Sequence, residues 1–329
     1  MNSYNNLIDK IVSKENMLLA YERTARSKRK TFGYLEFKEY KQLNLDALAD
    51  EMRSGEYKIG NYRQFIIYEP KPRLISALDF KDRLAQHALI SVIEPIFEAT
   101  FLPNTFACRA GLGTHAGVKY IQSELRKSEL PLYYLKTDFS KFFPSVNHNI
   151  LLEMIHKKIA CKLTLKMIEE IVKPNEVGIP IGSLTSQLFA NVYGSLLDMY
   201  IHHDLGHRKW ARYMDDVVIL GNDLKQLRDD FYKIAEFSGK NMNMRISKWH
   251  CGNVSGGINF LGYRIWETHK LIRKDSVTRA KMKIAKYVKY GDNLALNKFL
   301  ASWRGHAGWS NSHNLFMWLE RKHENNYQY

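Results

Sequence analysis

Two adjacent carboxylates stand near the middle of the chain, in the stretch Tyr213-Met214-Asp215-Asp216. The aliphatic run VVIL follows at residues 217–220 and predicts a buried strand. The shorter run WAR at residues 210–212 predicts a partner strand, so the two acids would lie at the tip of a hairpin. A relaxed two-residue turn would carry Asn-Gly or Gly-Gly. A turn that breaks this rule without structural gain is typical of a functional site.

A third carboxylate, Asp138, ends another predicted strand, YYLKTD at residues 133–138. A lone Asp-Asp pair would indicate only an acidic turn, but the second acidic strand changes the interpretation. Three carboxylates on two neighbouring strands can hold two Mg²⁺ ions, because hard cations prefer oxygen ligands. Two such ions activate an attacking oxygen and stabilise a leaving oxygen. Asp138, Asp215 and Asp216 therefore predict a two-metal phosphoryl-transfer site.

The amino-acid composition of the chain fits a protein that binds nucleic acid. The chain has 329 residues, of which 45% are hydrophobic and 25% charged, as expected of a soluble globular protein with two or three subdomains. Its net charge of +15 suggests a polyanionic partner. We find no membrane-length apolar run and no secretory signal, so we expect a cytoplasmic location and no membrane partner. The three cysteines are too scattered for a zinc pattern or a disulfide framework.

The N-terminal part reads as helices over residues 7–30 and 40–52, and then as a hairpin formed by residues 65–68 and 73–76. Helices over 79–99 and 114–127 follow. Lys71 and Arg73 flank Pro72 in the hairpin, and the rigid turn would hold Arg73 against a triphosphate. An ordinary surface arginine fits the spacing almost equally well.

A loop marked by Gly178, Pro180 and Gly182 follows a predicted helix over 148–159 and opens another helix, with Ser183 as its N-cap. Such a loop lets a phosphate or base pair approach the backbone closely, although alone it indicates only a well-capped helix. A helix over 224–238 comes next. Residues 259–265 predict a strand with an interior glycine, which suggests close approach of a ligand or another backbone.

The C-terminal part is basic and helical. Its first helix suits a duplex backbone, and two further helices are expected over 294–309 and 314–323. The cations of that first helix that we assign to nucleic-acid binding are Arg273, Lys274, Arg279, Lys283 and Lys286.

The order of these motifs resembles that of a reverse transcriptase over almost the whole chain. The resemblance implies an α+β right-hand fold with a palm of antiparallel sheet and helices. Residues 1–130 would hold the N-terminal segment, the fingers and part of the palm, 131–267 the palm, and 268–329 a helical thumb. It also implies RNA-directed DNA polymerase activity with two Mg²⁺ ions and dNTP substrates.

The same resemblance assigns site residues. Asp138, Asp215, Asp216 and the main-chain carbonyl of Phe139 would hold metal, and Phe143 stands where the family keeps its ribose gate. Lys71, Arg73, Ile181, Gly182 and Gln187 would bind the nucleotide. Lys248 lies near the fourth palm motif, where it would protonate pyrophosphate. The primer grip would consist of Phe260, Leu261, Gly262 and Tyr263.

The third motif narrows the subfamily. Most reverse transcriptases carry Gln-Gly and Ser-Pro there, whereas this chain has Ile181-Gly182 and Ser186-Gln187. This variant resembles the enzymes of diversity-generating retroelements of bacteria and phages. It implies copying of a template-repeat RNA into cDNA with errors at adenines, for mutagenic retrohoming in a bacterial host cell, and an oligomeric accessory variability protein as partner. The alternatives are a retron or group II intron-like enzyme and a catalytically silent nucleic-acid-binding protein.

Overall fold

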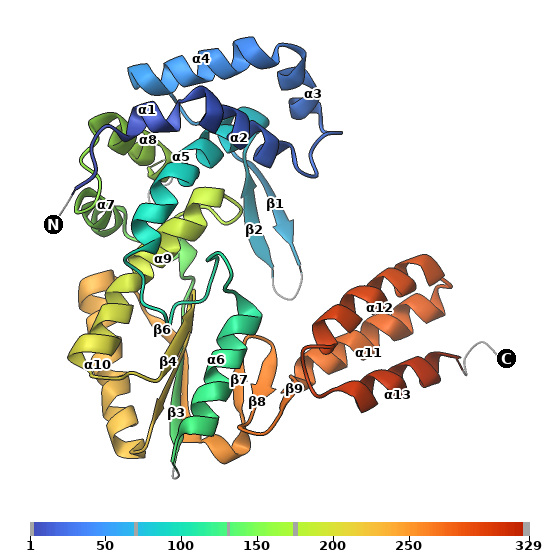
Figure 1. Cartoon of the computed structure of the whole chain (residues 1–329). Coiled ribbons are helices and arrows are strands. Elements are labelled where there is room, and N and C mark those ends of the chain that lie inside the picture. Colours follow the sequence, from blue (N-terminus) through green and yellow to red (C-terminus); the bar gives the residue numbers. More distant parts are fainter. Residues whose placement is uncertain (1–2, 69–71, 130–131, 174–176, 325–329) are drawn as a thin grey trace. The chain divides into compact units, whose positions relative to one another are not determined.

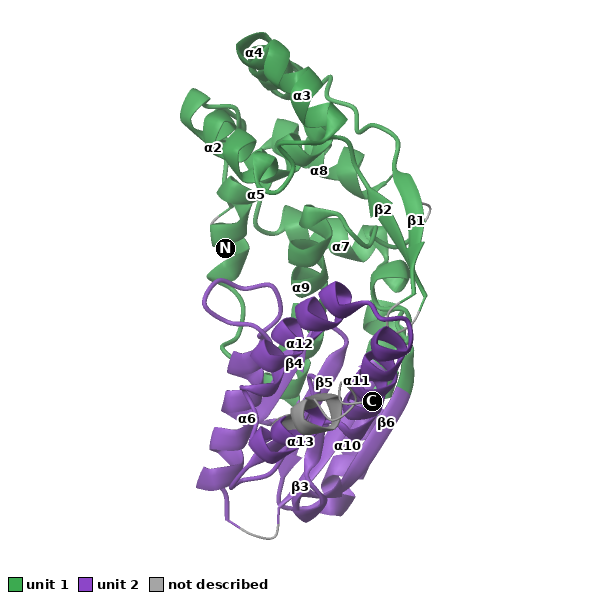
Figure 2. Ribbon diagram, turned by 90° about the vertical axis from the view of Figure 1, so that its right-hand side faces the viewer, with its two compact units in different colours: residues 1–103, 139–204, 233–247 green, residues 104–138, 205–232, 248–329 purple. Residues whose placement is uncertain are grey.

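A computed structural model describes residues 3–68, 72–129, 132–173 and 177–324 (Figure 1). Packing divides the chain into two units (Figure 2). Unit 1 takes residues 1–103, 139–204 and 233–247, and unit 2 takes residues 104–138, 205–232 and 248–329. The three-part division into fingers, palm and thumb stays a prediction. No described helix has the length and hydropathy needed to cross a bilayer.

Unit 1 is mostly helical, because its segments repeat apolar residues at helical spacing. Helix α5 (Phe80–Glu98) packs against α2 (Lys14–Ala25) and α9 (Leu184–Met199). Its inner residues Leu84, Ala88 and Ile93 are fully buried. The antiparallel hairpin β1 (Arg63–Ile67) and β2 (Arg73–Ala77) pairs as predicted. The other helices of this unit are α1 (Leu7–Ile11), α2 (Lys14–Ala25), α3 (Phe32–Glu39), α4 (Lys41–Ser54), η1 (Phe143–Ser145), α7 (His148–His156), α8 (Lys162–Val172), α9 (Leu184–Met199) and η2 (Tyr200–Asp204).

Three details of unit 1 differ from the sequence prediction. The helix expected over residues 7–30 is two helices, because the Ser13 hydroxyl accepts from Asn16 N (3.3 Å) and starts α2 anew. Helix α2 then ends at Ala25, before the basic cluster. Helices α3 and α8 were not predicted at all.

Unit 2 is built on a sheet with strand order β4-β5-β3-β6. Strands β3 (Tyr133–Phe139) and β4 (Trp210–Tyr213) both pair antiparallel with β5 (Asp216–Gly221). The fourth strand is β6 (Ile246–Asn253). Helix α6 (Thr114–Lys127) packs on β4. The chain passes from one unit to the other within β3, within β6 and within α10 (Leu224–Met242).

A second, three-stranded antiparallel sheet in unit 2 consists of β7 (Ile258–Phe260), β8 (Tyr263–Ile265) and β9 (Lys270–Ile272). It shares one hydrophobic core with α6, β3 and β5. The glycine expected inside a single strand, Gly262, instead lies in the turn between β7 and β8 with φ of 89°. Three helices follow, namely α11 (Lys274–Lys289), α12 (Asn293–Ala307) and α13 (His313–Glu324).

Candidate active site

The central hairpin forms as the sequence predicts. Tyr213 pairs with Asp216, so Met214 and Asp215 make a two-residue turn. Met214 takes a left-handed φ of 53°, which costs a non-glycine residue roughly 1–3 kcal/mol. The guanidinium of Arg212, which is fully buried, donates to the Met214 carbonyl (3.3 Å) and supports this turn. The strain is held by the surrounding structure and sets the position of Asp215.

The sheet register brings the acidic strands together. Asp138 on β3 stands directly opposite Asp216 on β5, and Asp215 precedes Asp216 in the turn. All three belong to unit 2. Side chains alternate along a strand, so Lys136 lies on the same face of β3 as Asp138. Its ammonium group donates to Asp216 Oδ2 at 3.0 Å.

The environment of Asp216 fits a nearby cation. Burial raises the pKa of its carboxyl to about 6; Lys136 opposes this shift, while the charges of Asp215 and Asp138 add to it. Its other oxygen, Oδ1, is buried and has no hydrogen-bond partner among the described residues. Converging negative charges with an unsatisfied oxygen are what a divalent ion would relieve.

The protein alone does not complete such a site. Within the part of the chain that the structure describes, no three His, Cys, Asp or Glu side chains are grouped closely enough to hold a metal ion. Asp216 already pairs with Lys136. An ion on Asp138, Asp215 and the other oxygen of Asp216, Oδ1, would draw its remaining ligands from water and substrate phosphates, as is usual for Mg²⁺.

In the β7–β8 hairpin of unit 2, the turn is more accessible to a ligand than the two aromatic side chains beside it. Phe260 and Tyr263 are completely buried, and the Tyr263 hydroxyl donates to the His306 carbonyl of α12 (3.0 Å). Leu261 and Gly262 form the half-buried turn, both with positive φ. A primer contact at this hairpin would therefore use the turn and its backbone, while the two aromatic side chains hold the hairpin in place.

The loop before α9 lies in unit 1 and is attached to its neighbours by the backbone. The Ile181 carbonyl accepts from Ser76 N (2.8 Å), next to Gly182 with φ of 108°. The Ile181 side chain is half-buried, and Gly182 is exposed. Ser183 precedes α9 as expected, but its hydroxyl donates to the Gln86 side-chain oxygen (2.9 Å). Gln86 thus fixes the start of the helix from α5.

The remaining predicted nucleotide-binding residues are placed as follows. Arg73 begins β2 and is exposed, Phe143 begins η1 and is half-buried, and Gln187 is exposed on α9. All three belong to unit 1, as does the buried Phe139. Lys71 lies outside the described residues. Nothing in their arrangement tests these roles, which stay predictions.

Lys248 lies in unit 2, on β6 beside β3. Its neighbour His250 stacks on Tyr134 (5.4 Å), which is on the Asp138 face of β3, so alternation places Lys248 on that face as well. Its role in proton transfer stays a prediction.

The predicted basic helix forms as α11, with Arg273 as its N-cap residue. Arg273 and Arg279 both pair with Asp275 (3.2 and 3.3 Å), and the Lys283 ammonium lies over the Phe299 ring (5.4 Å). Lys274 and Lys286 are exposed. Three of these five cations thus already make contacts with other side chains of unit 2.

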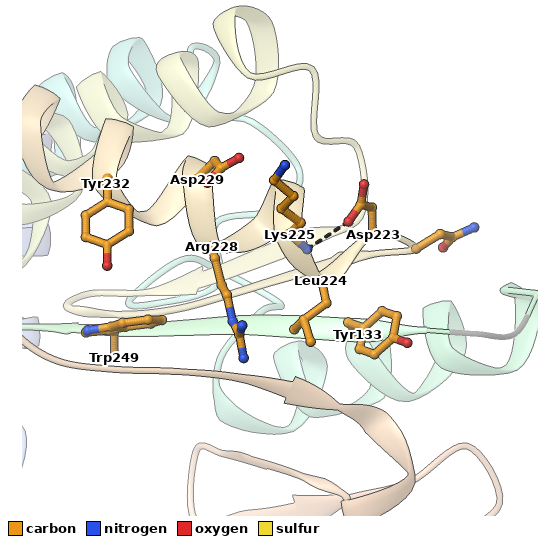
Figure 3. Close-up of a pocket in the computed structure, with 9 residues that line it drawn as sticks. Tyr133, Asp223, Leu224, Lys225, Arg228, Asp229, Tyr232 and Trp249 are labelled. Carbon is orange, nitrogen blue, oxygen red and sulfur yellow. Dashed lines mark hydrogen bonds between the residues drawn. The ribbon is translucent and has the colours of Figure 1, made fainter.

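A separate hollow of about 740 Å³ lies beside α10 (Figure 3). Tyr133 and Trp249 line it together with Arg228 and Tyr232, and Trp249 stacks on Phe231 at 4.1 Å. Tyr133 is an odd number of residues from Asp138 on β3, so the two side chains point to opposite faces. The hollow is therefore not part of the carboxylate site.

Comparison with known families identifies the chain. Residues 68–265 match the family model described as reverse transcriptase (RNA-dependent DNA polymerase). The chain belongs to the reverse transcriptases. This reverse transcriptase is thus an RNA-directed DNA polymerase, and enzymes of this family generally use divalent metal ions and dNTPs. The roles assigned above to individual residues stay predictions.

Curated relatives of this reverse transcriptase are distant. Protein YkfC of Escherichia coli is 23% identical over 71% of this chain and 72% of its own length. A putative COX1/OXI3 intron 1 protein of Saccharomyces cerevisiae is 20% identical over 84% of this chain but 41% of its own length. Group II intron-encoded protein LtrA of Lactococcus lactis is 22% identical over 49% of this chain and 29% of its own length. The chain thus spans less than half of these intron proteins.

The fold agrees with the family. An apo telomerase of Candida tropicalis superposes with a TM-score of 0.51 at 14% identity, over 67% of this chain and 49% of that one. The fold of the chain is therefore similar to that of this telomerase, and the predicted α+β fold with an antiparallel sheet and many helices is confirmed.

Phe143→Ala is expected to relax sugar selection by this reverse transcriptase. Phe143 is half-buried in η1, and its carbonyl accepts from Ile179 N (2.9 Å), so the backbone would stay in place when the ring is removed. Without the ring, a 2′-hydroxyl meets no steric block, and rNTP incorporation should rise relative to dNTP incorporation. Parallel dNTP and rNTP kinetics with thermal melting check this. Lost stability with unchanged sugar preference would mean that Phe143 serves only the core.

Proposed function

We propose that this reverse transcriptase copies a template RNA into cDNA with frequent errors at adenines, as the enzymes of diversity-generating retroelements do. The observation that carries the proposal is the loop at Ile181. Its backbone is fixed by Ser76, and its side chain is apolar. The resemblance described above implies a glutamine at this position in most reverse transcriptases. A glutamine can donate and accept hydrogen bonds, whereas isoleucine can only pack. The enzyme then has one polar contact fewer with which to select correct base pairs over incorrect ones.

Mg²⁺ is the proposed metal, as two ions held by Asp138, Asp215, Asp216 and the main-chain carbonyl of Phe139. When bound, it would lower the pKa of the attacking hydroxyl and stabilise the charge that develops on phosphate. Asp216 pairs with Lys136 through Oδ2, which leaves Oδ1 for the metal. The β7–β8 turn contacts the primer strand, and α11 with its exposed Lys274 and Lys286 attracts the duplex backbone.

The accessory variability protein belongs to the same proposal. It rests on the subfamily motif at Ile181 and Gln187, and no described contact of this chain identifies its docking surface. Co-purification of the two proteins from a host cell would test this part independently of fidelity.

A second candidate is a group II intron-type reverse transcriptase that copies faithfully. The intron-encoded relatives from yeast and Lactococcus favour it. The two candidates differ in one measurable quantity, the error frequency opposite template adenine. An intron-type enzyme would discriminate at adenine as well as at the other three bases.

Ile181→Gln is expected to lower misincorporation opposite template adenine by several-fold, more than it lowers correct synthesis. One added polar contact is worth on the order of 1 kcal/mol, which corresponds to roughly a five-fold change in discrimination. Single-nucleotide kinetics opposite adenine, with dTTP and with each wrong dNTP, measure the ratio of efficiencies.

Ile66→Gln serves as the control for Ile181→Gln, because Ile66 is exposed on β1 and the chemical change is the same. Faithful copying by the wild type would favour the intron-type candidate. The wild type could instead copy with errors while Ile181→Gln leaves the ratio of correct to incorrect incorporation opposite adenine unchanged. The source of error would then lie at another position, and Gln187 would be the next to test.

A further inference from the structure

Lys136 joins two parts of unit 2 that the sequence keeps far apart. Its ammonium group donates to Asp216 Oδ2 (3.0 Å) and to the Asn259 carbonyl (2.6 Å). Asp216 begins β5 at the catalytic hairpin, and Asn259 is the middle residue of β7. The side chains of Lys136 and Asp216 are only 20% and 22% exposed, so solvent screens this contact less than a surface ion pair.

The β7–β8 hairpin also pairs with β9 along β8, and the Gly262 carbonyl of its turn accepts from Arg273 N (3.1 Å). Two of its side chains contact helices. Leu261 packs against α6 at Gly117, where an added Cβ would come within 3.1 Å of Leu261 Cδ1. Tyr263 reaches α12 through its hydroxyl bond to His306. Beside these, the Lys136 ammonium ties the hairpin by a charge-assisted hydrogen bond to the strands that carry the acidic residues.

We propose that Lys136 is a positioning residue that fixes the β7–β8 hairpin to the carboxylate end of the sheet, so that the primer end is held in register with Asp138 and Asp215. The Lys136 ammonium group makes two contacts, and each has its own effect. It occupies Asp216 Oδ2, which keeps that carboxylate turned toward β3, and it sets the distance between β7 and β3. The proposal rests on the primer-strand contact assigned above to the β7–β8 turn.

The test replaces Lys136 by methionine, which keeps the length of the side chain but removes its charge and its donors. We expect Lys136→Met to bind a primer–template duplex on the order of ten-fold more weakly in EDTA, where no divalent ion is bound. In Mg²⁺, kcat for primer extension should fall, while KM for the dNTP stays near the wild-type value, since Arg73 and Ile181 are untouched. Lys136→Arg keeps a charge and several donors and should recover most of the duplex affinity.

Two further variants make the result interpretable. Lys127→Met removes one charge from an exposed ion pair with Glu124 (3.3 Å) and measures the effect of net charge alone. Leu261→Asp places a negative charge at the hairpin tip and tests the primer contact itself. All binding is measured well below the melting temperature of every variant, so that partial unfolding does not contribute.

Wild-type duplex affinity and kcat in Lys136→Met would overturn the proposal. So would a loss no larger than that in Lys127→Met, or a loss that Lys136→Arg fails to restore. If Leu261→Asp weakens binding but Lys136→Met does not, the hairpin contacts the primer without the help of Lys136. If neither weakens binding, the primer contact assigned to this turn is itself wrong.

Discussion

Asp215→Asn is expected to reduce DNA synthesis by on the order of 10³-fold while the protein stays folded. The amide has almost the same shape as the carboxylate, but it lacks the charge that a divalent cation requires. A metal ion contributes several kcal/mol to stabilising the transition state of phosphoryl transfer, which corresponds to this range of rates. Single-turnover primer extension in Mg²⁺ measures the loss, and thermal melting and duplex binding in EDTA report on the fold.

Asp223→Asn is the matched control for this experiment. Asp223 is exposed in unit 2 and accepts from Lys225 N (2.7 Å) at the start of α10. Asparagine caps a helix about as well as aspartate, so this variant should polymerise at nearly the wild-type rate. Wild-type extension by Asp215→Asn would show that Asp215 holds no catalytic metal.

The central hairpin at residues 210–221 was predictable because its signals are local. The run at residues 217–220 defines β5, and two residues between paired strands leave only Met214 and Asp215 for the turn. The sequence also predicted that the Asp138 strand lies next to this hairpin, but the register that sets Asp138 opposite Asp216 comes from the structure. Once two antiparallel strands are neighbours with their ends aligned, acidic residues at those ends lie close together.

The contacts that support this hairpin were not predictable in the same way. Lys136 could have been found as a same-face neighbour of Asp138, two residues away on β3, but its second partner Asn259 is 123 residues distant. Gln86 gives no signal at all, because a glutamine in an amphipathic helix is ordinary until α9 is placed against it. Long-range polar contacts depend on packing that no short pattern encodes.

The predicted boundaries of helices were wrong where a helix cap interrupts a continuous apolar periodicity. The apolar pattern runs through residues 7–30, but the Ser13 cap interrupts it, and only the hydrogen bond to Asn16 reveals the break. Gly262 shows a related ambiguity: a glycine within an apolar run can mark close approach or a tight turn, and here the pairing of Phe260 with Tyr263 selects the turn.

Gly182→Ala is expected to have the second-largest effect, lowering kcat/KM for dNTPs by about 100-fold. Gly182 has φ of 108°, and an added Cβ would lie 2.9 Å from Ile75 Cγ2 and 3.1 Å from the Ser76 carbonyl. Backbone atoms of β2 cannot move aside freely, so the loop itself must shift and take Ile181 with it. A displacement of about 1 Å in a residue that positions a substrate can cost on this order in rate. Steady-state kinetics with each dNTP measure the loss.

Gly113→Ala separates this clash from the intrinsic cost of the backbone conformation. Gly113 has φ of 122°, close to that of Gly182, but nothing lies within 4 Å of an added Cβ. Both variants should lose roughly 1–3 kcal/mol of stability from the strained backbone, and Gly182→Ala should melt at a lower temperature still because of its clash with β2. Only Gly182→Ala should lose catalytic efficiency, because only there does the methyl group press on β2. Equal kinetic losses in the two variants would mean that general strain, and not the contact with β2, accounts for the effect.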